Sequence, residues 1–205
     1  LIRDTIEQPL LYPELFERRS HGEPVRVWVP GCSTGQQAFS IAIGIHEFLG
    51  DAAATTPIQI FATDVNERSI GSARRGTYPA AIAEDVSPER LERFFVRSAA
   101  GFTDNKAIRS VCVFAAHDLL NDPPFSRIGL VYCSNVLIYI ERSMQRRIAT
   151  TFHYALAPAG FLMLGPAESL GAASNWFTVV DEKHKIYRTA PGARPHRETR
   201  EGAAA

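Results

Sequence analysis

The sequence predicts an α/β protein with an open, doubly wound and mostly parallel sheet. Apolar runs typical of strands alternate with segments of helical periodicity along most of the chain. The run Val25–Val29 passes through a glycine loop directly into a helical pattern, and Ile128–Cys133 is continuously apolar, as a central parallel strand should be. Alternation of this kind gives a sheet that is covered by helices on both faces.

The elements can be placed in order from their end signals. Residues 1–24 are expected to form a partly helical leading segment that ends in a polar turn. Asn66 can cap a helix that Gly76 stops, and Ser87 followed by Pro88 opens the next helix. The expected strands are 25–29, 58–63, 111–115, 128–133 and 161–164. The expected helices are 36–49, 66–75, 87–95 and 141–156, the last one closed by Pro158 and Gly160.

Three further segments complete the chain. The polar, glycine-containing stretch 97–109 is expected to form a short irregular or hairpin excursion. Residues 177–180 and 184–187 are expected to be two short strands of a terminal hairpin. The tail, 189–205, is rich in Pro, Gly, Ala and Arg without an apolar pattern, which predicts disorder. The main domain is therefore expected to span 25–188.

Size and charge exclude several classes of protein. A chain of 205 residues suits one α/β domain with a core large enough to be stable. The 22 basic and 22 acidic residues balance, so no overall field attracts nucleic acid or an anionic membrane. No apolar run approaches the ~20 residues of a membrane span and no signal peptide is visible, so we expect a cytoplasmic protein without membrane insertion. The chain begins at Leu1 rather than Met, so we expect a piece of a longer protein.

The cysteines and histidines favour neither a disulfide framework nor a metal site. Cys32, Cys112 and Cys133 are widely spaced and odd in number, which fits a reducing compartment. The six histidines are scattered, and the chain has no C-x-x-C or H-E-x-x-H pattern. No dedicated metal site is expected.

A glycine loop and an acid point to an adenosine ligand. The loop Gly31–Gly35 follows the first strand and lets backbone approach a nucleotide-like ligand closely. Asp64 ends the second strand, where its carboxylate can accept hydrogen bonds from both hydroxyls of a ribose. It lies about 30 residues beyond the loop, against ~20 in the dinucleotide fingerprint, and the loop is not G-x-G-x-x-G. Both differences disfavour NAD. The alternatives are a turn without a ligand and, for Asp64, a helix cap.

Polar side chains also follow the third and fourth strands. Asp118 can accept the exocyclic amine of adenine while Leu119 packs on the ring, or it can simply form a turn. Ser134 and Asn135, before an apolar run that ends in Tyr139, suit the floor of a cavity; an ordinary half-buried tyrosine is the alternative. Because carboxyl ends of parallel strands meet at one edge, we expect these side chains to converge with the glycine loop.

Together these segments resemble the chemotaxis-receptor glutamate methyltransferases, the CheR family. The likeness is greatest to the methyltransferase part of proteins that fuse methylesterase and methyltransferase modules. The matching segments occur in the family's order and span roughly residues 25 to 188. They are 27–35, 61–64, 73–78, 87–91, 122–126, 133–139, 156–169 and 181–187.

The resemblance implies a Rossmann-like sheet with a reversed final strand. It implies methyl transfer from S-adenosylmethionine to glutamate side chains of a chemoreceptor or other signalling protein, which leaves S-adenosylhomocysteine, and it suggests flanking signalling domains. By position, it assigns Gly31, Ser33, Thr34, Gly35 and Gln37 to the methionine end of the cofactor, Asp64 to the ribose, Asp118 and Leu119 to the adenine, Ser134 and Asn135 to the cofactor, Tyr139 to the transferring methyl and Arg3 to the reacting carboxylate.

The chain departs from the family pattern inside this pocket. The family usually has Glu-Glu where this chain has Gln36-Gln37, so a carboxylate facing the cofactor's ammonium becomes a neutral amide and binding should weaken. Ser134 replaces an Arg, Asp118 replaces an Asn, and the receptor-gripping region 97–109 is short. These changes leave open a weak or inactive methyltransferase module that serves as a binding domain, or a methyltransferase for another substrate. A dehydrogenase is disfavoured by the loop and the acid spacing.

Overall fold

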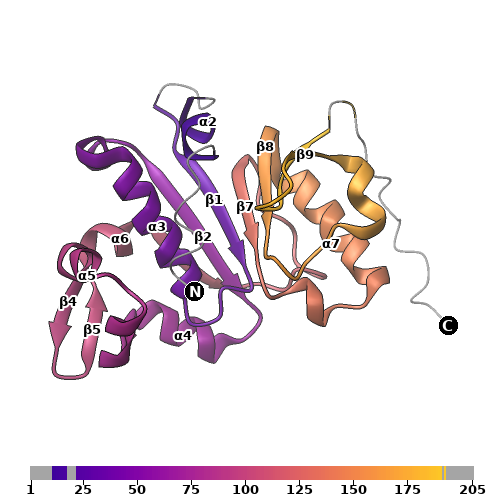
Figure 1. The fold of residues 1–205 in the computed structure, drawn as a ribbon. Helices are drawn as coiled ribbons and strands as arrows, with labels where there is room; N and C mark the ends of the chain where they lie inside the picture. Colours follow the sequence, from indigo (N-terminus) through magenta and orange to yellow (C-terminus); the bar gives the residue numbers. More distant parts are fainter. Residues whose placement is uncertain (1–10, 18–21, 191, 193–205) are drawn as a thin grey trace.

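The computed structural model describes residues 11–17, 22–190 and 192. A seven-stranded sheet with the order β6-β2-β1-β7-β8-β10-β9 forms its centre (Figure 1). The strands are β1 Val25–Pro30, β2 Ile58–Asp64, β6 Cys112–Ala116, β7 Ile128–Cys133, β8 Leu156–Leu164, β9 Phe177–Asp181 and β10 Ile186–Thr189. All neighbours in the run β6-β2-β1-β7-β8 are parallel, whereas β10 is antiparallel to β8 and to β9. The predicted Rossmann-like sheet with a reversed final strand is confirmed.

The sheet divides the core into two layers because alternate strand residues point to opposite faces. Val27 and Val29 pack with helix α3, while Trp28 between them packs with Phe152 of α7 on the other face. Trp28 is fully buried, and its indole Nε1 donates to Thr63 Oγ1 at 3.0 Å. The helices are α2 Leu11–Glu17, α3 Gln36–Leu49, α4 Glu67–Arg75, α5 Pro88–Phe94, α6 Lys106–Ser110 and α7 Arg142–Ala155.

Local side-chain chemistry fixes the helix ends where the sequence predicted them. Asn66 Oδ1 accepts from the N–H groups of Arg68 and Ser69 at the start of α4, and Gly76 ends the helix at a φ of 56°. Ser87 caps α5 with Pro88 in its first turn. These caps use the orphan N–H groups of a helix start and the left-handed freedom of glycine.

The junction of α7 and β8 differs from the sequence prediction. The helix ends at Ala155, and β8 begins at Leu156 rather than at Phe161. Leu156 already pairs with Ile128, and the ladder then shifts register before Phe161 pairs with Leu130. Pro158 and Gly160 therefore lie in an irregular strand start, where Ala159 has a φ of 61°. The long-range pairing with β7 decides this boundary, and no local signal carries it.

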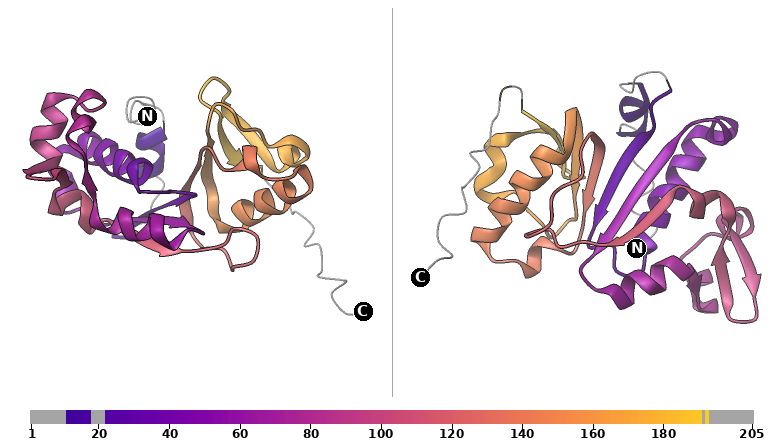
Figure 2. Two further views of the ribbon diagram at one scale, coloured as in Figure 1. Left: turned by 90° about the horizontal axis from the view of Figure 1, so that it is seen from below. Right: turned by 180° about the vertical axis from the view of Figure 1, so that it is seen from behind.

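A second, three-stranded sheet stands at the opposite end of the molecule from β9 and β10 (Figures 1 and 2). Its strands are β3 Thr77–Tyr78, β4 Phe95–Ser98 and β5 Gly101–Asp104, in the order β3-β5-β4. The segment 97–109 contains the end of β4, all of β5 and most of α6, so the predicted hairpin is present, formed by β4 and β5; strand β3 was not predicted.

The two ends of the chain are only partly described. Leu11, Tyr12 and Leu15 of α2 are buried in the same core as β1 and α3, so this part of the leading segment belongs to the main domain. Thr189 pairs with Phe177 and the Ala190 N–H donates to Trp176 O, so the sheet extends beyond the predicted start of the tail. Residues 1–10 and 193–205, with Arg3 and most of the tail, lie outside the described residues.

Asp104 makes stability depend on pH. Its side chain is buried at 3% exposure, and neither carboxylate oxygen has a hydrogen-bond partner among the described residues. Desolvation raises the pKa of Asp104 to about 7, against a partly offsetting attraction from Arg109. Above the ordinary pKa of an aspartate, the unfolded state has lost this proton while the folded state still holds it. The free energy of unfolding therefore falls as the pH rises towards 7 and through it.

We therefore expect Asp104→Asn to stabilise the protein at pH 8 by at least about 1 kcal/mol and to have a smaller effect at pH 5. Urea unfolding at both pH values measures this difference. The exposed Asp51→Asn serves as a control in which the two values should agree. A gain that is the same at pH 5 and pH 8 would contradict the buried, proton-binding role.

Candidate functional site

A cavity of about 480 Å³ opens at the carboxyl ends of β1 and β7. The strand order reverses between these two neighbouring parallel strands: β2 and β6 follow on the side of β1, and β8 follows on the side of β7. Ligands of open α/β sheets bind at such switch points. The lining residues are Gly31, Cys32, Ser33, Thr34, Gln36, Gln37, Tyr78, Pro79, Ala81, Ile82, Asp85, Ser134 and Asn135.

The glycine loop forms one wall and its backbone requires glycine. Gly31 has a φ of 66°, and a Cβ there would lie 2.2 Å from Val136 Cγ2. Gly35 has a φ of 94° and is the N-cap of α3 without any side-chain cap. A side chain at either position would strain the backbone, and at Gly31 it would collide with the opposite loop. The first turn of α3 therefore faces the cavity with backbone N–H groups that no side chain of a cap residue satisfies.

Asp64 holds the glycine loop to the end of β2. Its Oδ2 accepts from the Ser33 N–H at 2.9 Å, and its Oδ1 accepts from the Asn66 N–H at 2.8 Å. Asn66 is the cap of α4, so the alternative that Asp64 caps this helix is wrong. Asp64 is not among the residues that line the cavity, but it is bonded directly to Ser33, which is. Each carboxylate oxygen retains a second lone pair with which it can accept a hydroxyl.

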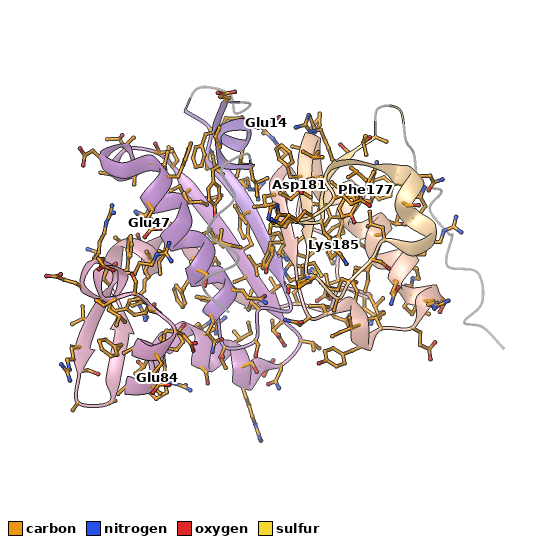
Figure 3. The ribbon with its side chains drawn as sticks, viewed as in Figure 1. Glu14, Glu47, Glu84, Phe177, Asp181 and Lys185 are labelled. Atoms are coloured by element: carbon orange, nitrogen blue, oxygen red, sulfur yellow. The ribbon has the colours of Figure 1, made fainter. Side chains whose placement is uncertain are left out.

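Glu168 holds the opposite wall of the cavity in place. No role was predicted for this residue from the sequence. Its side chain is 2% exposed. Its Oε1 accepts from the N–H groups of Val136 and Leu137 at 2.8 and 2.9 Å, and its Oε2 accepts from that of Gly165 at 2.9 Å. Lys185, labelled in Figure 3, donates through Nζ to the Glu168 carbonyl at 2.5 Å. The buried carboxylate thereby ties the loop after β7, with Ser134 and Asn135, to the end of β8.

Asp118 and Leu119 follow β6, the edge strand beyond β2, and do not line the cavity. Asp118 Oδ1 accepts from the Leu120 N–H and Oδ2 from Asn121 Nδ2, both at 2.8 Å. These hydrogen bonds, that from Asn121 first, hold the pKa of Asp118 below its ordinary value. The side chain thus forms a local turn, which was the alternative reading. Leu119 packs against the core face that contains Trp28.

Tyr139 is neither half-buried nor part of the cavity. It ends the short 3-10 helix Leu137–Tyr139, and 81% of its surface is exposed. Gln145 Nε2 donates to the carbonyls of Leu137 and Ile140, both at 2.9 Å, and so fixes the turn that carries the ring. Of the sequence-predicted residues, the cavity unites Gly31, Ser33, Thr34, Gln37, Ser134 and Asn135.

The segment 78–85 supplies a third wall that sequence reasoning missed. Tyr78 is buried with its ring against Phe39 and Phe95, and its hydroxyl has no hydrogen-bond partner among the described residues. Burial, and then the Asp104 carboxylate, raise the pKa of Tyr78, so this hydroxyl is neutral. Gln37 Oε1 is likewise buried without a partner in the described part of the chain. Two unpartnered polar atoms in one cavity suit a polar ligand.

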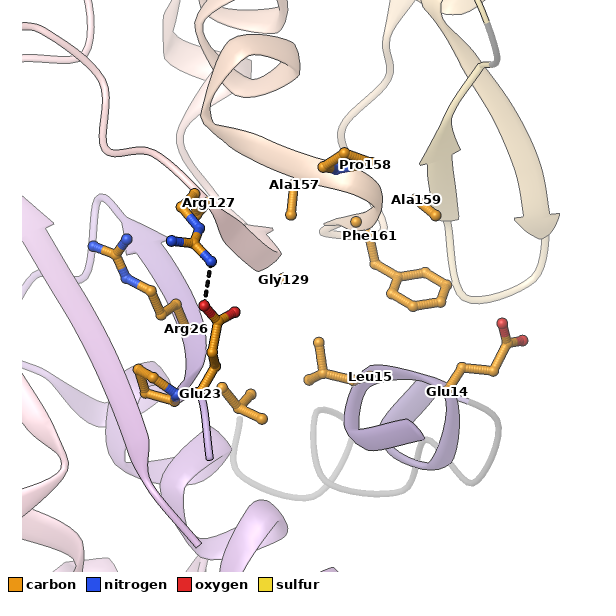
Figure 4. A pocket seen from close by; sticks show the side chains of 13 residues that line it. Glu14, Leu15, Glu23, Arg26, Arg127, Gly129, Ala157, Pro158, Ala159 and Phe161 are labelled. Atoms are coloured by element: carbon orange, nitrogen blue, oxygen red, sulfur yellow. Dashed lines mark hydrogen bonds and ion pairs between the residues drawn. The ribbon is translucent and has the colours of Figure 1, made fainter. Parts of the chain in front are cut away.

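A second cavity, of about 330 Å³, lies at the other end of the strands (Figure 4). It is bounded by α2 and the irregular start of β8, with Leu15 and Phe161 among its walls and the ion pair Glu23–Arg127 at 2.5 Å on its rim. None of the sequence-predicted site residues lines it. The amino ends of parallel strands are not where ligands of this fold bind.

None of the described helices is long and apolar enough to cross a membrane. Within the described ranges, no three or more His, Cys, Asp or Glu side chains gather into a group that could hold a metal ion. The three cysteines are free thiols.

The sheet order, the reversed strand and the cavity at the switch point are those of a nucleotide-type α/β site. Residues 3–186 match the family described as CheR methyltransferase, SAM binding domain, and the chain belongs to this family. The domain is thus one that binds S-adenosylmethionine.

Two relatives illustrate the range of the family. An "Uncharacterized 104.1 kDa protein in hypE 3'region" of Rhodobacter capsulatus is 38% identical over 189 residues, which are 92% of this chain and 20% of that protein. "Chemotaxis protein methyltransferase 1" of Pseudomonas aeruginosa is 34% identical over 184 residues, which are 86% of this chain and 66% of that protein. The chain thus spans a fifth of one relative and just under two thirds of the other.

Proposed function

We propose that this chain transfers the methyl group of S-adenosylmethionine to glutamate side chains of chemoreceptors and forms glutamate methyl esters. Family membership and one observation support this: the glycine loop and the loop after β7 enclose a cavity at the switch point of the sheet. The protein would act in the cytoplasm, in chemotaxis or related signalling, and flanking signalling domains would bring it to its substrate.

The residues present fit the cofactor. The glycine loop presents backbone rather than side chains to the cavity, because neighbouring side chains leave no room for a Cβ at Gly31 or Gly35, and Gln37 Oε1 offers an unused acceptor to the methionine end. Asp64 retains lone pairs for the ribose hydroxyls. Asn135 and Ser134 would contact the cofactor from the opposite wall. The adenine assignment to Asp118 and Leu119 rests on the family resemblance alone.

The chemistry demands alignment rather than a strong base. The cofactor supplies a methyl group on a positively charged sulfur. A glutamate carboxylate is ionised at neutral pH, so its oxygen can form the new C–O bond as the C–S bond breaks and the electron pair returns to sulfur. The chain's own residues would bind, orient and desolvate the two partners. Cys32 is unsuited to act as a nucleophile, because burial raises the pKa of its thiol to about 12.

A non-catalytic binding module is the second candidate, and the cavity carries an observation in its favour. Ser134 is 5% exposed and sits so close to Gly165 that a Cβ there would lie 2.4 Å from its hydroxyl oxygen. Where the family usually has an arginine, this chain has a buried serine, so it presents no cation at this position. Such a module would bind cofactor weakly and serve as a scaffold or sensor.

Titration of S-adenosylmethionine and S-adenosylhomocysteine into the chain, followed by a transfer assay, separates the candidates. Labelled methyl that is incorporated into a chemoreceptor signalling fragment and released by base as methanol supports the transferase. Tight binding of S-adenosylhomocysteine supports a working cofactor site. Absence of both signals favours the non-catalytic module.

Tyr139→Phe is expected to lower turnover about tenfold, the effect of losing one hydrogen bond to the substrate, and to change the Kd of S-adenosylhomocysteine less than about twofold. The hydroxyl stands exposed on a turn that Gln145 holds, so it can meet a substrate without lining the cofactor cavity. Steady-state kinetics and calorimetry measure the two effects, with the exposed Tyr154→Phe as a control. Equal losses of turnover and affinity would count against this placement of Tyr139.

A further inference from the structure

We propose that Asp85 binds the ammonium group at the amino-acid end of the cofactor. This inference rests on the proposed cofactor site and names a residue of the 78–85 segment as its charged contact. Among the described residues that line the cavity, Asp85 is the only one with a charged side chain. The two other ionisable side chains of this lining, Cys32 and Tyr78, remain neutral because burial raises the pKa of each.

The ligand itself requires a carboxylate in this place. S-adenosylmethionine carries a carboxylate, an ammonium and a sulfonium, and burying a cation without an anionic or strong acceptor partner is costly. Gln37, on the first turn of α3, offers only a neutral amide oxygen to that cation. A charged acceptor forms a hydrogen bond that is roughly twice as strong as a neutral one. The cavity therefore needs a carboxylate on a wall other than α3.

The start of α3 suits the other end of the zwitterion. Gly35 caps the helix without a side-chain hydrogen bond, so backbone N–H groups and the positive end of the helix dipole favour a carboxylate there. With the ligand's carboxylate at this helix end, its ammonium, on the same carbon, lies within the same part of the cavity. Asp85 from the facing segment and Gln37 Oε1 would then share its N–H donors.

Hydrogen bonding and packing order the backbone around Asp85, so its carboxylate extends from an ordered turn. The Asp85 N–H donates to Ile82 O at 3.0 Å and closes the 3-10 helix Ala80–Glu84. Tyr78 and Val86, which flank this turn, are both buried in the core. Asp64 already accepts one hydrogen bond on each carboxylate oxygen, from the N–H groups of Ser33 and Asn66, and it does not line the cavity.

Calorimetry with three ligands tests the assignment on the chain of 205 residues. S-adenosylmethionine and S-adenosylhomocysteine both carry the ammonium, and only the first carries the sulfonium. 5′-Methylthioadenosine has neither. Asp85→Asn keeps the shape of the side chain and removes its charge. Glu84→Gln is the matched control, because Glu84 is the adjacent acidic residue, is exposed like Asp85 and does not line the cavity (Figure 3).

We expect Asp85→Asn to weaken both amino-acid ligands about tenfold and 5′-methylthioadenosine less than about twofold. Glu84→Gln should leave all three Kd values within about twofold. Unchanged affinities, or equal losses for all three ligands, would overturn the role of Asp85 and leave the cofactor site standing. A loss confined to S-adenosylmethionine would place Asp85 at the sulfur and also overturn it. If the unmodified chain binds none of the three, the proposed function fails and this inference with it.

Discussion

Asp64→Ala should abolish measurable binding of S-adenosylhomocysteine, a loss of at least about a hundredfold in affinity. Hydrogen bonds to a charged acceptor contribute about 1.5–3 kcal/mol each, and two ribose hydroxyls would lose their acceptor at once. The same change removes the contacts to the N–H groups of Ser33 and Asn66, so the glycine loop would lose its fastening to the end of β2. Calorimetric titration measures the effect directly.

Two further variants separate the ligand role from the structural one. Asp64→Asn keeps one acceptor oxygen and should retain part of the loop geometry while it weakens binding less than alanine does. Asp51→Asn, on the exposed 3-10 helix Gly50–Ala54, should change nothing. An Asp64→Ala chain that binds S-adenosylhomocysteine with unchanged affinity would overturn the ribose assignment.

Glu168→Ala is expected to cost about 3–5 kcal/mol of the free energy of unfolding, because each buried donor that is left without a partner costs about 1–3 kcal/mol. Three backbone N–H groups, those of Val136, Leu137 and Gly165, would lose their shared acceptor inside the core. The loop that presents Ser134 and Asn135 would lose its tie to β8, so cofactor affinity should fall as well. Urea unfolding followed by circular dichroism gives the stability.

Two comparison variants test whether the loss of stability is specific to the buried carboxylate. Glu182→Ala, at the exposed turn between β9 and β10, should stay within about 0.5 kcal/mol. Glu168→Gln should lie between alanine and wild type in stability, because one of its two positions becomes a donor that faces another donor. A loss in Glu168→Ala no larger than in Glu182→Ala would contradict the structural role of this buried carboxylate.

Where the fold follows from local chemistry, the sequence predicted it closely. Helix α3 has the predicted bounds, and Asn66 and Gly76 define α4 because caps act within a few residues of themselves. The start of β8 was wrong, since Leu156 joins the sheet through Ile128 and no nearby residue signals this pairing. Strand β3 was missed for the same reason: two residues gain strand geometry only by pairing with β5.

The same distinction between local and long-range determinants applies to the site. The convergence of the glycine loop with Ser134 and Asn135 was predictable, because parallel strands bring their carboxyl ends to one edge. Asp85 and Glu168 were not, since their roles depend on which loop lies opposite them in space. Asp118 forms a turn, as its residue type alone favours. The exposure of Tyr139 depends on how Gln145 holds the preceding turn, which the sequence does not display.

The central claim is that the cofactor lies between the glycine loop and the loop after β7. Amide hydrogen exchange with and without S-adenosylhomocysteine tests it most directly. We expect added protection in 31–37, 64–66 and 134–137, and none in 23–26, 127–129 and 157–161 around the cavity of Figure 4. Protection confined to the amino-end cavity, or spread without relation to the two loops, would contradict the account.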